Sequence, residues 1–101
     1  MAEPGDGGLT ELFREVSVSP AEYARTLGLA FPGALTGGPL HLRARSGEVE
    51  LAVELTVGPE RRIALVRLPT LYVHIRFLSG DHDARRRVLR HMDLAMQRGG
   101  G

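Results

Sequence analysis

Residues 40–57, LHLRARSGEVELAVELTV, decide the fold, because two alternating stretches meet there at a Ser46-Gly47 turn signal. In residues 40–45 every second residue is apolar, and the residues between are histidine or arginine. In residues 49–57 valines and leucines alternate with glutamate, alanine and threonine. A period of two is typical of antiparallel strands with one buried and one exposed face. The stretch therefore predicts a β-hairpin within an antiparallel sheet.

The turn residues also predict how the two strands align. A two-residue Ser46-Gly47 loop fixes which residues lie opposite each other. The resulting alignment places opposite charges across from one another, as stable cross-strand pairs require. The expected pairs are Arg45 with Glu48, Arg43 with Glu50, and Leu42 with Leu51.

Further strands are expected on both sides of this hairpin. Residues 63–66 are apolar at every position, so we expect a third strand that lies centrally in the sheet. Residues 71–77 alternate again and predict a fourth meander strand, separated from the third by Pro69. Near the N-terminus, residues 12–18 favour a strand, although the spacing of apolar residues over 9–18 also fits a helix.

Two helices are marked by their start signals. Ser19-Pro20-Ala21-Glu22 is a capping box with proline at the first helical position, and the helix should end before Pro32. Asp81 is a good N-cap for a second helix that runs to about Gln97. Its apolar stripe predicts packing against the sheet.

Together these signals predict an α+β fold in the order β-α-β-β-β-β-α. We expect two layers: a four- to five-stranded antiparallel meander sheet, with the capped helix before it and the long C-terminal helix packed on one face. Residues 9–98 form the single predicted domain, and residues 1–8 and 99–101 are expected to be a flexible tail and a glycine tail.

Composition narrows the class of protein. The 101-residue chain has a net charge of +1, and its thirteen basic residues are all arginine, as expected for a bacterial-type protein from a GC-rich genome. The absence of cysteine excludes disulfides and thiolate chemistry and favours a reducing compartment. Residues 1–8 do not resemble a signal peptide, and no apolar run is long enough to cross a membrane. We therefore expect a cytoplasmic protein with no membrane association.

The polar face of the sheet is the first candidate binding site. We expect this face to carry His41, Arg43, Tyr72, His74 and Arg76. Tyrosine and arginine are enriched at protein interface hot spots. A solvated face with cross-strand ion pairs is the plainer interpretation of the same pattern.

Other candidate sites have weaker support. Asp81, His82 and Asp83 with His74 and His41 contain metal-ligating groups, but a helix cap explains the two aspartates, so we expect no metal. Arg85, Arg86, Arg87 and Arg90 offer a nucleic-acid alternative, although consecutive helical residues point in different directions. A small-ligand pocket between the sheet and the helices would be lined by Tyr23, Phe31, Phe77 and Met92.

No pattern of catalytic residues stands out. The serines lie in no nucleophile elbow, the glycine clusters lack the lysine of a P-loop, and the glutamates share one exposed strand face. We therefore expect a non-catalytic binding or adaptor domain, without a cofactor, that acts through its open sheet face. Its partner would be another protein or a second copy in a homodimer.

Overall fold

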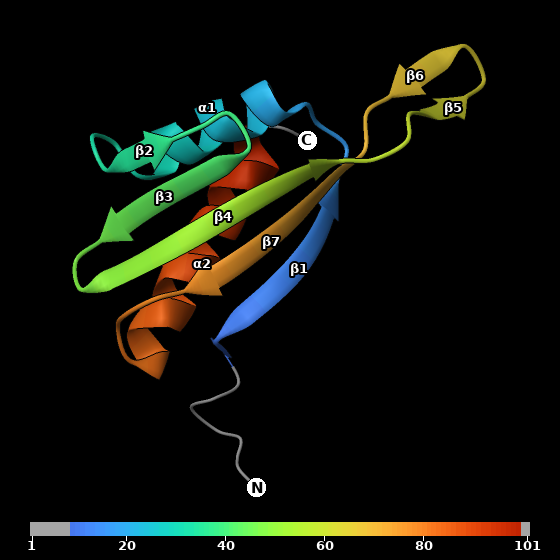
Figure 1. The fold of residues 1–101 in the computed structure, drawn as a ribbon. Helices are drawn as coiled ribbons and strands as arrows, with labels where there is room; N and C mark the ends of the chain where they lie inside the picture. Colours follow the sequence, from blue (N-terminus) through green and yellow to red (C-terminus); the bar gives the residue numbers. More distant parts are fainter. Residues whose placement is uncertain (1–8, 100–101) are drawn as a thin grey trace, which may run out of the picture.

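The structure is a computed structural model that describes residues 9–99, so the predicted tail over residues 1–8 lies outside the described residues, as do residues 100–101. Strands and helices follow one another along the described chain as labelled in Figure 1. They are β1 (Glu11–Val16), α1 (Pro20–Ala30), β2 (Leu35–Gly37), β3 (His41–Ser46), β4 (Val49–Val57), β5 (Arg61–Ile63), β6 (Val66–Leu68), β7 (Leu71–Phe77) and α2 (His82–Gly99). The predicted α+β class is confirmed.

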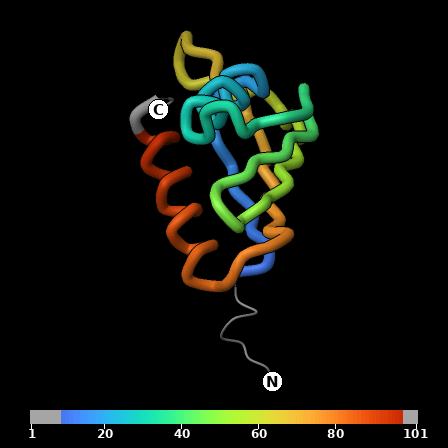
Figure 2. Tube along the Cα trace, turned by 90° about the vertical axis from the view of Figure 1, so that its left-hand side faces the viewer, coloured from blue at the N-terminus to red at the C-terminus, as the bar shows by residue number. Residues whose placement is uncertain are grey.

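Five of the strands form one antiparallel sheet in the order β1-β7-β4-β3-β2. Both helices lie on the same side of this sheet, as Figures 1 and 2 show from two directions. The predicted two-layer arrangement is therefore confirmed. No described helix covers the other face of the sheet, which leaves that face open.

The N-terminal strand is confirmed, and the helical interpretation of the same residues is wrong. β1 pairs with β7 along its whole length, with Leu12 opposite Ile75 and Val16 opposite Leu71. Leu12 and Val16 are half-buried against the core, whereas Phe13 is exposed. The two apolar residues that face the core are thus related by the period of two, and Phe13 falls on the opposite side.

The hairpin of β3 and β4 is confirmed, but its predicted alignment is wrong. The turn lies one residue later in the chain, so each β3 residue pairs with the β4 residue two positions beyond the predicted one. Ser46 pairs with Val49, so the turn residues are Gly47 and Glu48. Gly47 has a φ of 60°, and a glycine with positive φ at the first central position suits a type II′ hairpin turn. The observed pairs are Arg45 with Glu50, Ala44 with Leu51, Arg43 with Ala52, and Leu42 with Val53. The shift preserves which face each side chain occupies.

The predicted central strand at residues 63–66 is wrong. β4 pairs directly with β7, and the intervening residues form the separate β5–β6 hairpin that projects beyond the end of the sheet in Figure 1. Ile63 and Val66 are 54% and 55% exposed, and Leu65 at the tip is fully exposed. The prediction was wrong because an exposed hairpin can contain the same run of apolar residues as a buried strand. β4 is the middle strand of the five, with β7 on one side of it and β3 on the other.

Both helix starts are confirmed by their capping bonds. Ser19 Oγ accepts a hydrogen bond from the Glu22 backbone N–H at 3.1 Å, and Pro20 stands at the start of α1. Asp81 Oδ1 accepts one from the Ala84 N–H at 2.8 Å. Such caps contribute about 1 kcal/mol each. They fix where the helices begin, and thereby which residues face the sheet.

The core lies between the helices and the inner face of the sheet. Leu27 of α1, Leu51 of β4 and Met92 of α2 are essentially inaccessible to solvent. Tyr23 of α1 is also buried, and burial, with a smaller contribution from the nearby Asp93 carboxylate, raises the pKa of its hydroxyl to about 12. The core therefore contains one ionisable group that resists losing its proton.

Leu51→Ala should lower the free energy of unfolding by about 2–5 kcal/mol, because it leaves a cavity at a fully buried position. Leu65→Ala is the matched control, since Leu65 is fully exposed, and should change stability by less than about 0.5 kcal/mol. Urea denaturation followed by circular dichroism measures both. A nearly neutral Leu51→Ala would contradict the assignment of the buried face.

Stability should also fall at high pH because of Tyr23. Its pKa is higher in the folded chain than the usual 10, so its contribution is complete below pH 10 and is lost as the pH rises toward 12. The expected loss is about 2 kcal/mol. Denaturation curves at several pH values should show this slope in the wild type and in Tyr72→Phe, but not in Tyr23→Phe. An unchanged slope in Tyr23→Phe would assign the pH dependence to other groups.

Candidate functional site

Alternate residues of four strands point away from the helices and make up the open sheet face. It comprises Glu11, Phe13 and Glu15 of β1; Tyr72, His74 and Arg76 of β7; Glu50, Ala52, Glu54 and Thr56 of β4; and His41, Arg43 and Arg45 of β3. All five residues that the sequence predicted for this face are on it. Cross-strand pairing aligns two of them, His74 and His41, on either side of Glu54.

An aromatic stack stands at the centre of the β1–β7 part of this face. The rings of Phe13 and His74 are 4.3 Å apart between centroids and only 12° from parallel. Phe13 is nevertheless 70% exposed. A large apolar ring held in a fixed orientation toward solvent is a typical anchor for a protein partner.

Two carboxylates hold the His74 ring in place. Glu11 Oε1 accepts a hydrogen bond from His74 Nε2 at 2.6 Å, and Glu54 Oε1 lies 3.5 Å from Nδ1. Both ring nitrogens therefore face an acceptor group, one on each neighbouring strand. This clamp fixes the imidazole plane, and the stacked Phe13 ring is fixed with it.

The arginines of the face are also paired. Arg43 lies 2.9 Å and Arg45 3.3 Å from the Glu50 carboxylate, and Arg76 lies 3.7 Å from Glu54. Exposed pairs of this kind contribute at most about 1 kcal/mol each to stability. Their larger effect is on the surface itself, because they leave few uncompensated charges that a partner would have to desolvate.

A shallow hollow of about 420 Å³ lies beside the stack. Phe13, His74 and Tyr72 line it together with Glu54 and Thr56. Tyr72 is 43% exposed, and its ring lies over Gly58, where any side chain would collide with it. The hollow therefore joins the two exposed aromatic residues of the face into one patch.

The five predicted site residues do not converge on a single point. His74, Arg76 and Tyr72 follow one another along β7, whereas Arg43 and His41 lie two strands away on β3. This arrangement fits an extended contact surface better than a pocket around one small molecule. Their role in binding stays a prediction.

Sequence reasoning missed Phe13. The sequence favoured a strand over residues 12–18 but did not assign Phe13 to the polar face, where β1 places it between Glu11 and Glu15. The signal that could have found it was an aromatic residue between two glutamates at a spacing of two. The signal was usable only once the segment was known to be a strand.

The four α2 arginines do not form one basic surface. Arg85 donates hydrogen bonds to the carbonyl oxygens of Ser79 and Leu9 and lies against the Phe77 ring. Arg87 lines a hollow beside the β3–β4 turn, whereas Arg86 and Arg90 line a groove on another side of the helix. This divergence weakens the nucleic-acid alternative, which requires several cations along one backbone.

The small-ligand alternative also lacks a common cavity. Phe31, Phe77 and Met92 are 3%, 5% and 1% exposed and belong to the packed core. Tyr23 lines a different pocket, of about 310 Å³, with Val18 and Thr26 among its neighbours. The four residues are therefore core residues in this fold.

The suggested metal ligands are dispersed. Asp81 caps α2, and His74 is engaged by two glutamates. Within residues 9–99, no three histidine, aspartate or glutamate side chains come together in a way that could hold a metal ion. Over the same residues, neither helix is both long and apolar enough to span a membrane.

Comparisons of this chain with protein-family models, with curated proteins and with solved structures found no match.

Proposed function

We propose that this chain is a non-catalytic protein-binding domain that acts through its open sheet face, and that a second copy of the chain is its partner there. The observation that carries the proposal is the Phe13–His74 stack. It combines 70% exposure of a phenylalanine with a fixed ring orientation. Burying such a ring against a partner gains roughly 1.5–3 kcal/mol without the cost of ordering it.

The charges on the face favour a protein over a nucleic acid or a small anion. Four carboxylates, Glu11, Glu15, Glu50 and Glu54, stand among its three arginines, Arg43, Arg45 and Arg76. Most are already paired with one another or, for Glu15, with Arg61 at 3.3 Å. A phosphate backbone would meet more carboxylates than arginines on this face.

The mixture of positive and negative charges on the open sheet face also supports self-association. Two copies related by a two-fold axis place identical patches against each other, so a strongly charged face would repel itself. This face carries both signs in close proximity and an aromatic patch at its centre, as preferred in interface cores. Each protomer would then cover the exposed Phe13 of the other.

Phe13→Ala should shift a self-associating wild type toward the monomer in sedimentation velocity across a concentration series. The variant should fold normally, because the Phe13 side chain fills no part of the core. Leu29→Ala is the matched control, since it removes an equally exposed apolar side chain from α1. That variant should sediment like the wild type.

Tyr72→Ala extends the test to the other aromatic residue of the patch and should weaken association in the same direction. A wild type that stays monomeric at the highest concentrations would contradict the proposal. So would a dimer whose stability is unchanged by Phe13→Ala and Tyr72→Ala, because the interface would then lie elsewhere.

A further inference from the structure

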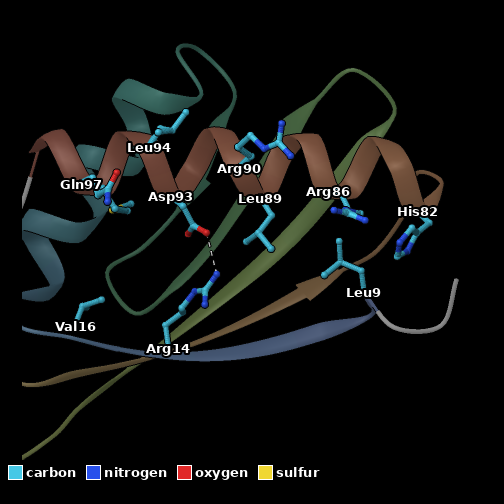
Figure 3. Close-up of a pocket in the computed structure, with 11 residues that line it drawn as sticks. Leu9, Arg14, Val16, His82, Arg86, Leu89, Arg90, Asp93, Leu94 and Gln97 are labelled. Carbon is cyan, nitrogen blue, oxygen red and sulfur yellow. Dashed lines mark hydrogen bonds and ion pairs between the residues drawn. The ribbon is translucent and has the colours of Figure 1, made fainter. Parts of the chain in front are cut away.

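A groove runs between α2 and the edge strand β1, on the side of the sheet that the helices occupy (Figure 3). It has a volume of about 910 Å³. Its apolar lining comes from both elements and includes Leu9, Val16, Leu89, Leu94 and Met96. The groove exists because α2 covers the middle of the sheet and leaves the inner side of β1 only partly packed.

The charged side chains of the groove are mostly cationic. The Arg14–Asp93 ion pair, 2.9 Å long, crosses from β1 to α2, as the dashed line in Figure 3 shows. Because this pair uses the Asp93 carboxylate, Arg86 and Arg90 have no ion-pair partner among the described residues. They stand one turn apart on α2, and the groove therefore has an uncompensated positive charge above an apolar floor.

The neighbouring edge of β1 has free backbone groups. β1 pairs only with β7 among the described strands. The Phe77 N–H donates a hydrogen bond to the Thr10 carbonyl at 2.8 Å, so Thr10 and every second residue after it direct their backbone groups toward β7. The N–H and C=O groups of Glu11, Phe13 and Glu15 consequently point out of the sheet edge.

One edge of the sheet is protected against the addition of another strand, and the other edge is available for it. At the far edge, β2 has only three residues and is followed by Pro39, which lacks an N–H donor. Short strands and proline are common means of blocking strand addition. β1 has six residues and no proline, so its edge offers a template for another strand.

We propose that β1 accepts an extended segment of an acidic partner protein as a sixth strand of the sheet. Every second side chain of that segment would project into the groove, because strand side chains alternate between the two faces. Acidic side chains at these positions would pair with Arg86 and Arg90, and apolar ones would cover Leu89 and Val16.

Charge complementarity favours an acidic polypeptide over two other candidate occupants, a second copy of the chain and a nucleic acid. A second copy that joined edge to edge through its own β1 would bring a second Arg86–Arg90 pair alongside the first, and like charges in contact disfavour the complex. A nucleic acid would use the arginines but would leave the apolar floor and the backbone edge without a partner. Only an acidic extended polypeptide satisfies all three features.

The test uses a blocked peptide of about eight residues, long enough to span β1. Threonine occupies every second position, and glutamate and valine alternate at the others. Titration of the isotope-labelled full chain, followed by NMR and amide hydrogen exchange, should show binding with new protection at the Phe13 and Glu15 amides. A control peptide with lysine in place of glutamate should bind at least about tenfold more weakly.

Variants separate backbone pairing from side-chain contacts. Glu15→Pro removes an outward N–H without breaking the β1–β7 ladder and should weaken binding about tenfold or more, whereas Glu15→Ala should remain within about twofold of the wild type. Replacing Arg86 and Arg90 by glutamine should weaken binding and reduce its salt dependence. Phe13→Ala keeps its backbone groups, so peptide binding should survive even where self-association through the open sheet face is lost.

Three results would overturn the proposal. The first is equal binding of the glutamate and lysine peptides, or no binding at all. The second is bound peptide that leaves the Phe13 and Glu15 amides unprotected, a result that needs no variant and therefore stands even if Glu15→Pro fails to fold. The third is a wild-type dimer that dissociates in Glu15→Pro but not in Phe13→Ala, because the occupant of the edge would then be a second copy.

Discussion

The pairing of β7 with β1 on one side and with β4 on the other is the interaction on which the rest of the structure depends. It brings the first strand of the described chain beside the last, with Leu12 opposite Ile75. Leu71, Val73, Ile75 and Phe77 of β7 are all buried, so this strand contributes a continuous row of side chains to the core. The residues between them lie on the other face of the sheet, where they pair with Glu11 and Phe13 of β1 and with Glu54 of β4.

Both proposed surfaces follow from that pairing. β1 pairs with β7 alone among the described strands, so it is an edge strand, and its two faces have different surroundings. Its outward residues bring an exposed aromatic ring onto a surface whose charges are balanced. Its inward residues face a groove that α2 does not close and that carries two arginines without an ion-pair partner in the described part of the chain. Under the two proposals, the domain would contact a different partner through each face of this strand.

Local signals predicted the elements well. Alternation in residues 40–57 and 71–77 identified β3, β4 and β7 and the faces of their side chains, because burial imposes a period of two on any half-buried strand. The capping residues Ser19 and Asp81 located both helix starts, because the unpaired N–H groups there need acceptors from the chain itself. These are properties of neighbouring residues, which a sequence displays directly.

Features that depend on distant residues were not predictable in the same way. Residues 63–66 have the composition of a buried strand, and only the direct pairing of β4 with β7 excludes them from the sheet. The predicted partners across β3 and β4 were two residues off because Gly47 can stand at either central turn position, and the backbone conformation decides between them. Phe13 was missed because its role depends on a strand about sixty residues away in the chain, at His74.

The most direct measurement of this pairing is disulfide formation between two introduced cysteines in a chain that has none of its own. Phe13 and His74 lie directly opposite each other in a non-hydrogen-bonded pair, where Cα atoms stand about 4.5 Å apart and a disulfide fits without backbone movement. Intact-mass spectrometry after mild oxidation should show a complete intramolecular disulfide in Phe13→Cys/His74→Cys. It should show little in Phe13→Cys/Arg76→Cys, which is displaced by one pair along the same face. Equal oxidation of both variants, or none in the first, would contradict the placement of β1 beside β7.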